Sequence, residues 1–344
     1  MKASVLVSFH NHQSLVCRVA TSVLAQDFDD FELIFIDDSS TDDTYRVLKE
    51  TIKSFSGFRG RKIKCLRNEH NLGIVGTFNR LMEESMGELC IVHCGDDVAH
   101  VDKVSKIVSY WDKAAAVDSH VVLATTECNI LDYNMNLVRA KPQKCTFTIE
   151  SGVSFFNRGL NLLGATAVYS RKMWELYGPM DPNARYEDHI MAFRAAMCGN
   201  VVRIAEPLID YRSEGGASTS FRTSYSHVIE RTKRTLHSFL QMESDLARSE
   251  SFLNKDSHLK YQKWLVERIE RQTLLVDLQN QNFSMAKFKL VKRLCGQIRQ
   301  GNANVWWFVF FLPRTFVEVA SQLRGRLGNA KRCMLVRLFG DPNR

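Results

Sequence analysis

The feature that most constrains the fold is an alternation of short apolar runs with segments of helical spacing. The apolar runs cover residues 3–9, 31–36, 63–66 and 89–93. Runs of this kind are typical of strands that are buried on both faces. After them, apolar residues recur at helical spacing over residues 13–24, 41–55, 71–86 and 101–111. Residues 1–115 therefore predict a parallel sheet with crossover helices.

Polar loops follow three of these strands, at residues 8–11, 37–40 and 95–97. In an open parallel sheet, ligands bind beyond the carboxyl ends of the strands, so we expect the three loops to form one site. Two loops contain adjacent acids, Asp37-Asp38 and Asp96-Asp97. Adjacent carboxylates repel each other, and a divalent cation or a ligand rich in donors relieves that repulsion. The alternative is that the acids only shape turns or cap helices.

The remainder of the chain has a different pattern. Residues 116–218 read as mixed α and β structure, with strands expected at 121–125, 165–169, 201–204 and 208–211. A helix is expected at 186–197, with Glu187 and Asp188 in its first turn. Residues 219–300 then read as helical, with long polar and basic faces. We expect a catalytic part followed by a helical extension.

Several segments carry a resemblance to a known family. They are SVLVSFHN (4–11), FELIFIDDSSTDDT (31–44), NEHNLGIVGTFNRLMEESMGELCIVHCGDD (68–97), GATAVYSRKMWELYG (164–178) with RYEDHIMAFRAAMCG (185–199), and EPLIDYRSEGGAS (206–218). In this order they resemble family 2 glycosyltransferases, which are inverting, nucleotide-sugar-dependent enzymes of the GT-A fold. The resemblance implies an α/β GT-A catalytic domain at 1–218, with a mostly parallel sheet and flanking helices. Its nucleotide-binding half is 1–115, its acceptor-side half is 116–218, and a helical basic region follows at 219–344.

The resemblance also implies roles for residues on the donor side. Asp38 matches the position that binds the nucleotide base, and Asp37 helps to hold that loop. Ser8 belongs to the opening strand-end loop and is assigned to the nucleotide-sugar site. Asp96 and Asp97 match the acids of the metal motif, one on the ribose or sugar side and one on Mg²⁺ or Mn²⁺. Which of the two binds the metal is left open, with Asp97 favoured.

Further assignments concern the acceptor side and the end of the catalytic domain. Asp188 matches the general base, although it and Glu187 would also suit a helix dipole with no catalytic role. Arg212 binds the diphosphate or forms a structural salt bridge. Two positions depart from the family pattern. Cys94 stands where an acid often precedes the central Asp, and Glu214 stands where many members have His and is a candidate metal ligand.

The implied reaction explains these residue types. A diphosphate leaving group carries charge that a divalent cation neutralises as the glycosidic bond breaks. Hard cations prefer carboxylate oxygens. Inversion requires the acceptor hydroxyl to attack from the opposite face, where a carboxylate takes its proton.

The charge of the chain is unevenly distributed. The formal net charge is +8, from 46 Lys and Arg against 38 Asp and Glu. From Ser284 onward there are 12 basic and 2 acidic residues. Residues 305–312 are rich in aromatic side chains, and apolar and basic residues alternate near helical spacing up to 344. This pattern predicts a membrane-surface segment at 305–344 that lies on anionic lipid. The alternative is that it packs on the catalytic domain or on a second subunit.

Compartment and acceptor follow from the same observations. Nine cysteines without a CxxC pair indicate free thiols. The longest uncharged apolar run has eight residues, whereas a spanning helix needs roughly 20. We expect a cytoplasmic enzyme, peripheral at the inner face of the membrane. Its expected acceptor is a saccharide or lipid-linked saccharide in the synthesis of O-antigen, capsule or exopolysaccharide.

Two other functions would explain part of this pattern. A nucleotidyltransferase would share strand-end acids, but it would usually show a Gly-rich loop with Arg or Lys after the first strand, and residues 8–11 contain none. A nucleic-acid-binding protein could use the basic tail, but it would leave the acidic loops unexplained. We therefore expect no nucleic acid partner.

Overall fold

The computed structural model describes residues 1–57, 62–160, 162–213 and 225–280. The chain begins with β1 (Ala3–Phe9), α1 (Val16–Leu24), β2 (Phe31–Asp37), α2 (Thr44–Ser54), β3 (Lys62–Arg67), α3 (Gly73–Glu84) and β4 (Leu89–Cys94). The four strands pair in parallel in the order β3-β2-β1-β4. Every residue of β2 is buried, which accounts for its continuous apolar run. The predicted parallel sheet with crossover helices is confirmed.

Beyond β4 the sheet becomes mixed. The further strands are β5 (Val98–Ala99), β6 (Val121–Leu131), β7 (Leu137–Arg139), β8 (Phe147–Ser151), β9 (Ala167–Ser170) and β10 (Asn200–Arg212). β9 is antiparallel to both of its neighbours, β4 and β6. β10 is parallel to β6 and antiparallel to β5 and β8. The main path is β3-β2-β1-β4-β9-β6-β10-β5, with β7 on β6 and β8 on β10.

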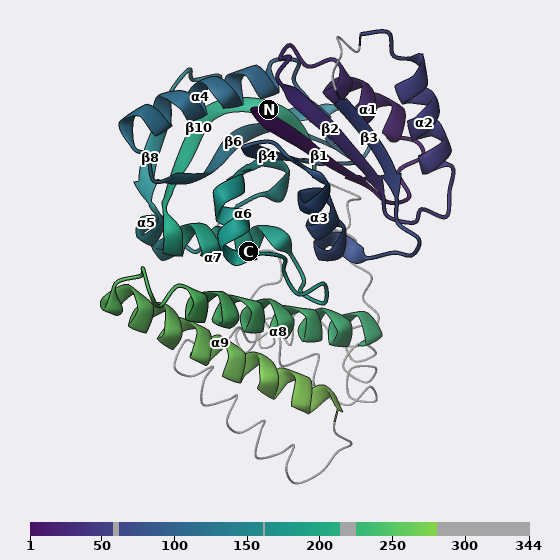
Figure 1. Cartoon of the computed structure of the whole chain (residues 1–344). Helices are drawn as coiled ribbons and strands as arrows, with labels where there is room; N and C mark the ends of the chain where they lie inside the picture. Colours follow the sequence, from purple (N-terminus) through teal and green to yellow (C-terminus); the bar gives the residue numbers. More distant parts are fainter. Residues whose placement is uncertain (58–61, 161, 214–224, 281–344) are drawn as a thin grey trace, which may run out of the picture. The chain divides into compact units, whose positions relative to one another are not determined.

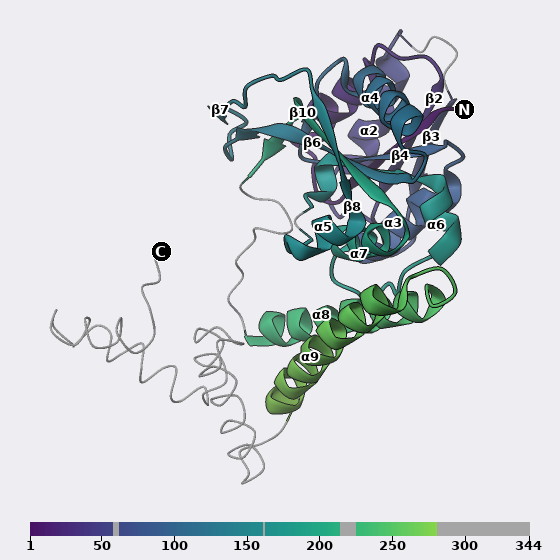
Figure 2. The same ribbon diagram turned by 90° about the vertical axis from the view of Figure 1, so that its left-hand side faces the viewer.

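Helices cover both faces of this sheet (Figure 1, Figure 2). On one face, apolar residues of α1, α2 and α4 (Lys103–Val117) form a common core with the strands. On the other face lie α3, α5 (Gly152–Asn157), α6 (Arg171–Tyr177) and α7 (Glu187–Cys198). There Phe78 packs edge-on against Tyr169 and Trp174, with ring centroids 5.9 and 6.0 Å apart. The second face also carries the acids at the start of α7.

Three sequence expectations need correction. The two strands expected around Pro207 are one strand, β10, whose register shifts on either side of Pro207. Proline lacks an N–H group, and a bulge accommodates it without ending the strand. The strand expected at 165–169 begins with a 3₁₀ turn, Gly164–Thr166, before β9. The helix expected from residue 41 starts at Thr44, whose N–H donates to Asp42 Oδ1 at 3.0 Å.

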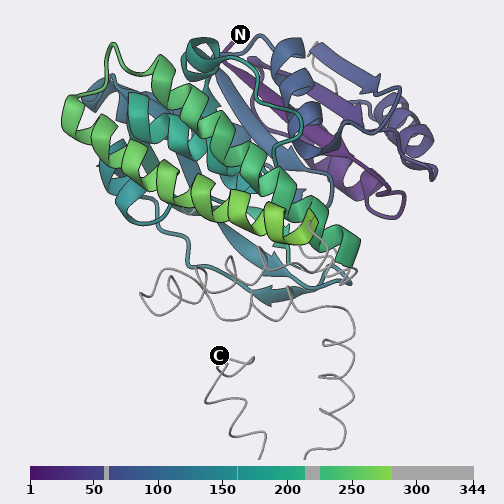
Figure 3. The ribbon, with the colours of Figure 1, turned by 90° about the horizontal axis from the view of Figure 1, so that it is seen from below.

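The helical region predicted after residue 219 is confirmed within the described residues by α8 (Tyr225–Arg248) and α9 (Lys255–Asn280), which lie side by side (Figure 3). The described residues form two compact units, 1–213 with 234–266, and 225–233 with 267–280. In the second unit, Gln272 Nε2 donates to the carbonyl of Thr232 at 2.9 Å. The domain boundary expected at 218 stays a prediction.

Within the first unit, residues 234–266 hold α7 in place. Arg194 Nε lies 2.7 Å from Asp245 Oδ2, and both side chains are fully buried. Arg194 Nη1 also donates to the carbonyl of Gly178 at 2.8 Å. Phe193 stacks on Trp264, with ring centroids 5.9 Å apart. The helix that carries Glu187 and Asp188 is therefore anchored by residues of α8 and α9.

Two expectations fall outside the described residues, namely Glu214 and the proposed membrane-surface segment 305–344. Among the described helices, none combines the length and the apolar character that crossing a membrane requires.

Candidate active site

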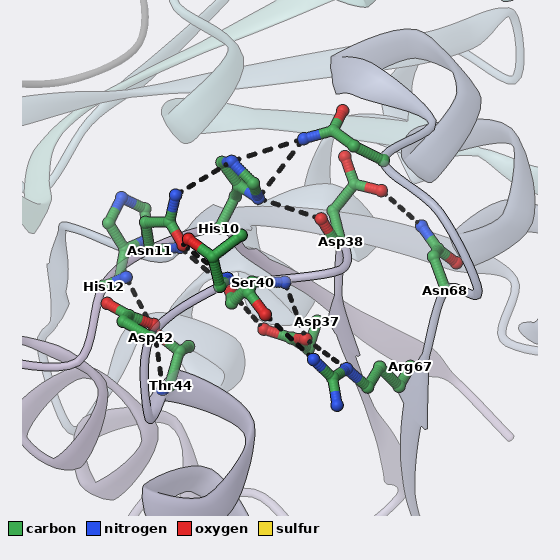
Figure 4. Close-up of polar contacts among 12 residues, drawn as sticks. His10, Asn11, His12, Asp37, Asp38, Ser40, Asp42, Thr44, Arg67 and Asn68 are labelled. Atoms are coloured by element: carbon green, nitrogen blue, oxygen red, sulfur yellow. Dashed lines mark hydrogen bonds and ion pairs between the residues drawn. The ribbon is translucent and has the colours of Figure 1, made fainter.

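Asp37, the last residue of β2, holds its own loop. Its side chain is fully buried. The carboxylate accepts hydrogen bonds from the hydroxyl of Ser40 and from its backbone N–H (3.1 Å), and Arg67 Nε lies 3.2 Å away. The Ser40 hydroxyl in turn accepts from the N–H of Asn11 at 2.9 Å, which ties this loop to the one after β1 (Figure 4). Asp37 is thus a structural anchor between two strand-end loops.

Asp38 connects β2 to the start of α3. Its Oδ1 accepts from Asn68 Nδ2 at 2.7 Å (Figure 4) and from the N–H of Leu72 at 2.8 Å. Its Oδ2 accepts from the N–H of Gly73 at 3.0 Å. Gly73 has a φ of +71°, a conformation that glycine adopts without a steric penalty. Asp38 therefore sets where α3 begins, and its implied contact with a nucleotide base stays a prediction.

The backbone is strained where these two loops meet. Asn11 and Ser39 have φ values of +56° and +54°, in the left-handed region. Asn11 Oδ1 accepts from the N–H of Thr41 at 2.9 Å, and His10 Nδ1 donates to the carbonyl of Asp38 at 2.8 Å (Figure 4). Non-glycine residues persist in this conformation only where surrounding contacts enforce it, and such residues cluster at binding sites.

The second acid pair, Asp96-Asp97, follows β4, and fewer of its oxygens have hydrogen-bond donors from the protein. Asp97 is fully buried, and its Oδ1 accepts from the backbone N–H of Arg212 at 2.8 Å. Its Oδ2 is buried without a hydrogen-bond partner among the described residues. Burial, and then the neighbouring charge of Asp96, raise the pKa of Asp97 well above its ordinary value. A buried carboxylate oxygen without a partner is costly, which indicates that a ligand completes its coordination.

A buried lysine lies beneath this pair. Lys103 Nζ donates to the carbonyl of Val92 at 3.1 Å and to Nδ1 of His93 at 3.2 Å. His93 Nε2 then donates to the carbonyl of Asp97 at 3.2 Å. Burial lowers the pKa of Lys103 to about 8 and lowers that of His93 well below its ordinary value. These groups fix the backbone of the acidic turn, and nothing in the sequence pattern had pointed to Lys103.

The turn before the acids requires glycine. A Cβ atom at Gly95 would lie 2.5 Å from the carbonyl oxygen of Ser8 and 2.6 Å from Nδ1 of His12. That His12 nitrogen is also buried without a partner among the described residues. Burial lowers the pKa of His12, which the charge of Asp96 partly offsets. Sequence reasoning assigned His12 no role, because a lone histidine is usually packed or solvated.

The third acid pair begins α7. Glu187 is buried, and burial, followed by the charge of Asp188, raises its pKa to about 8. Burial also raises the pKa of Asp188, against backbone hydrogen bonds from His189 and Gly164 that lower it. The His189 N–H donates to Asp188 Oδ1 at 2.8 Å. A Cβ atom at Gly164 would lie 2.8 Å from Glu187 Oε1 and 3.6 Å from Asp188 Oδ2, so both carboxylates approach this glycine closely.

The second and third acid pairs surround a common centre. Burial raises the pKa of Cys94 well above its ordinary value, and the charges of Asp97, Asp96 and Glu187 add to this. Burial likewise raises the pKa of Tyr169, whose hydroxyl has no partner among the described residues, with contributions from Glu187, Asp188 and Cys94. Cys94 is therefore close to both pairs, and Tyr169 is close to Cys94 and to the third pair. Sequence reasoning missed Tyr169 because its strand is antiparallel and separated from β4 by more than 70 residues.

Ser8 and Arg212 are the two remaining residues that the sequence analysis placed in the site. Ser8 is half-buried in β1, in register with Cys94 of β4. Arg212 is buried and reaches Asp97 through its backbone N–H, while its guanidinium lies over the ring of Tyr133 at 4.6 Å and donates to the Tyr133 carbonyl at 3.2 Å. Whether Arg212 also binds a diphosphate stays a prediction.

A divalent cation fits this donor set. The described residues hold no group of three or more His, Cys, Asp or Glu side chains arranged to enclose a metal by themselves. Mg²⁺ usually takes one or two protein carboxylates and completes its shell with waters and substrate phosphates. Asp97 Oδ2 is a buried oxygen without a partner, and Asp96 is its neighbour. These two residues suit a cation that is bound together with a phosphorylated ligand.

Comparison with protein families now identifies the chain. Residues 4–174 match the family described as "Glycosyl transferase family 2". The chain belongs to glycosyl transferase family 2. The matched segment contains the loops after β1, β2 and β4, including Asp38 and Asp97. The resemblance drawn from the sequence is confirmed, and with it the glycosyltransferase class. Asp188 lies beyond the matched segment.

Three curated proteins illustrate the similarity. The Bacillus subtilis glycosyltransferase EpsE is 28% identical over 33% of this chain and 39% of its own length. An uncharacterized glycosyltransferase of Nostoc sp. is 26% identical over 70% of this chain and 76% of its own. The Escherichia coli UDP-Glc:alpha-D-GlcNAc-diphosphoundecaprenol beta-1,3-glucosyltransferase WfaP is 24% identical over 32% of this chain and 41% of its own. The matches to EpsE and WfaP thus span less than half of those proteins.

A solved structure shares the fold. S. aureus TarS 1–349 in complex with UDP-GlcNAc aligns with a TM-score of 0.50 at 19% identity. The alignment covers 88% of this chain and 92% of that one. At this identity the likeness establishes the fold alone, and it agrees with the mixed, mostly parallel sheet and flanking helices expected from the sequence.

Proposed function

We propose that this protein transfers a sugar from a nucleotide diphosphate to a hydroxyl group of a saccharide acceptor, with inversion at the transferred carbon. The observation that carries the proposal is that two acid pairs, Asp96-Asp97 and Glu187-Asp188, from distant parts of the sequence lie close to the same residue, Cys94. One pair suits the charged leaving group, and the other suits the acceptor proton. Family membership supports the reaction class.

On the donor side, the loops after β1 and β2 would bind the nucleoside. Asp37 and Ser40 keep these loops together, and Asp38 holds the start of α3 beside them. A preformed loop binds its ligand more tightly because less conformational freedom is lost on binding. The structure of TarS in complex with UDP-GlcNAc supports a nucleotide-sugar donor, since this chain shares its fold.

At the diphosphate, Asp97 Oδ2 would hold a divalent cation, with Asp96 facing the ribose or sugar. Mg²⁺ or Mn²⁺, when bound, neutralises the charge that develops on the diphosphate as the glycosidic bond breaks. Lys103 and His93 keep the backbone of Asp97 in place during this step. Occupation of the site also gives the buried Asp97 carboxylate the partner that it lacks.

On the acceptor side, Asp188 is the proposed general base. It is less buried than Glu187 and is therefore the member of the pair that an acceptor hydroxyl can reach. With a pKa raised to about 8, Glu187 keeps its proton at neutral pH, so it does not repel the negative charge of Asp188. Asp188 Oδ2 takes the proton as the hydroxyl oxygen forms its bond to the sugar.

The proposed acceptor is a saccharide, or lipid-linked saccharide, of a bacterial surface polysaccharide. The acceptor in the name of WfaP, a GlcNAc-diphosphoundecaprenol, supports this choice. The basic composition after residue 284 supports a place at an anionic membrane surface. A liposome flotation assay with the intact chain, and with a chain that lacks 305–344, tests this part of the proposal, and an intact chain that stays in solution would contradict it.

A panel of nucleotide sugars tests the reaction itself. Purified protein is incubated with each donor and with Mg²⁺, Mn²⁺ or EDTA, and release of the nucleoside diphosphate is measured. We expect slow hydrolysis of one donor by water, lost in EDTA and greatly accelerated by the correct acceptor. Absence of hydrolysis with every donor, or full activity in EDTA, would refute the proposed mechanism.

A further inference from the structure

A separate cavity lies on the sheet face that carries α7. Its volume is about 280 Å³, and it opens between β6, β8, β10 and the 3₁₀ turn Gly164–Thr166. Five threonines line it, at positions 125, 126, 146, 148 and 166. Pockets for drug-sized ligands measure roughly 300–1,000 Å³, so this cavity suits a smaller group such as one sugar ring.

The threonines are arranged by the register of the sheet. Arg203 of β10 is paired with Thr125 of β6 on one side and with Thr148 of β8 on the other. Residues in register on neighbouring strands project from the same face, so these three side chains form one row. Thr125 continues the row to the turn through a 2.9 Å hydrogen bond between its hydroxyl and that of Thr166. The row presents hydroxyl and methyl groups side by side.

The hydroxyl groups that face the cavity come from Thr125 and Thr148 of the row and from Thr166 of the turn. The charged side chains of the lining are already paired, Glu127 with Lys141 at 3.1 Å and Arg203 with Glu150 at 4.0 Å. The cavity therefore suits an uncharged ligand rich in hydroxyl groups.

The cavity adjoins the proposed catalytic base through a single short turn. Leu163 and Thr166 line the cavity, whereas Gly164 between them lies against the carboxylates of Glu187 and Asp188. A ligand in the cavity and a hydroxyl at Asp188 would thus lie on the two sides of this turn.

We infer that the threonine-lined cavity is a subsite for a sugar unit of the acceptor, adjacent to the unit whose hydroxyl is deprotonated by Asp188. Each threonine offers a hydroxyl to the polar edge of a sugar ring and a methyl group to its apolar face. The inference rests on the function proposed above for the identity of the ligand. It adds a binding site whose lining strands, β6 and β8, contributed no residue to the donor and base assignments.

Binding of simple glycosides to the full chain tests this inference. Saturation-transfer NMR is recorded with methyl β-glucoside, methyl β-galactoside and N-acetylglucosamine, in the presence of excess UDP or GDP to fill the donor site. We expect at least one glycoside to bind with the nucleotide present. The double variant Thr125→Val with Thr148→Val should weaken that binding by roughly 5–150-fold, as expected for the loss of two neutral hydrogen bonds. The exposed Thr21→Val on α1 is the matched control and should bind as the wild type does.

A second variant keeps the test independent of hydroxyl chemistry. Ala205→Phe places a ring in the cavity while the backbone bonds of Ala205 to Thr146 and Lys144 remain available, and it should abolish glycoside binding. Failure of every glycoside to bind the wild type, displacement by the nucleotide, or unchanged binding in both variants would overturn the inference. Failure of the proposed function would instead appear as absence of hydrolysis in the nucleotide-sugar panel, which does not involve these glycosides.

Discussion

The chain has an Asp-Asp pair after β2 and another after β4, but the hydrogen bonds that the two pairs accept differ. In the β2 loop, both oxygens of Asp37 and of Asp38 have hydrogen-bond donors from the protein. In the β4 loop, Asp97 has one donor and one buried oxygen without a partner. A carboxylate whose partners are all internal holds the fold together. A carboxylate with an unpaired oxygen reduces stability until a ligand arrives.

The same contrast separates the surroundings of the β2 loop from the region of Cys94 and Tyr169. On the β2 side, the loop is tied to its neighbours and would bind its ligand without rearrangement. Around Cys94 and Tyr169, burial raises the pKa of several acids at once. Groups whose titration is shifted in this way are typical of catalytic sites. We expect the first region to hold a ligand in place and the second to take part in the reaction.

The largest effect should come from Asp97→Asn. We expect transfer to fall by about 10³-fold or more, since several kcal/mol of charge stabilisation at the diphosphate are lost. The free energy of unfolding should fall less than in Asp37→Asn, because one oxygen of Asp97 has no hydrogen-bond donor to lose, whereas both oxygens of Asp37 have donors. Steady-state kinetics and urea unfolding measure the two quantities. Asp102→Asn, at the start of α4, is the control with near-normal activity. A loss of stability in Asp97→Asn as large as that in Asp37→Asn would contradict the contrast between the loops.

Asp188→Asn should come next in size. We expect transfer to fall by about 10²–10⁴-fold, the range that a positioned base contributes, with donor affinity nearly unchanged. Transfer assays combined with calorimetric titration of the nucleotide separate these effects. Glu187→Gln on the same helix is the matched control and should cost less than Asp188→Asn. A larger loss in Glu187→Gln would mean that the roles of the two acids are exchanged.

The Asp37→Asn variant probes the loop after β2, where both oxygens of each acid have hydrogen-bond donors. It weakens the bonds to Ser40 and leaves Arg67 without its ion-pair partner. We expect the free energy of unfolding to fall by about 1–3 kcal/mol, which is typical for a buried group deprived of its partner. Urea unfolding of this variant beside Asp97→Asn makes the comparison direct. Equal stability of the two variants would show that the distinction between the loops does not hold.

The smallest effect concerns pH. The pKa of Glu187 is raised from 4.5 to about 8 in the folded protein. Between these values the folded chain retains a proton that the unfolded chain has lost, so the free energy of unfolding falls as the pH rises. The slope from this group is at most about 1.4 kcal/mol per pH unit. Glu187→Gln should remove this contribution in unfolding curves at pH 5.5, 6.5 and 7.5, whereas the exposed Glu175→Gln should keep the wild-type slope.

The strand-end acids could be located from the sequence because their signal is local. A continuous apolar run marks each parallel strand, and the residues after it must lie at the carboxyl edge of the sheet. The difference between Asp37 and Asp97 was not predictable in this way. It depends on Arg67, Ser40 and Arg212, and the last of these lies 115 residues from Asp97.

The acceptor side was harder to predict for a similar reason. β9 enters the sheet antiparallel between β4 and β6, and this placement brings Tyr169 beside Glu187 and Asp188. A short strand after a 3₁₀ turn carries no periodic pattern that indicates its direction or its neighbours. The close approach of Gly164 to both carboxylates was equally hidden, since a single glycine in a sequence has many structural uses.

The buried pair of Arg194 and Asp245 has a consequence for the order in which the protein is assembled. These residues are 51 positions apart, which corresponds to about 3–10 s of synthesis at roughly 5–20 residues per second. During that interval α7 carries a guanidinium whose burial without its partner would cost about 3–5 kcal/mol. The parallel strands and their loops are complete well before then. On the ribosome, strands β1 to β4 and their loops are therefore ready first, and α7, with Glu187 and Asp188, is locked only when α8 emerges.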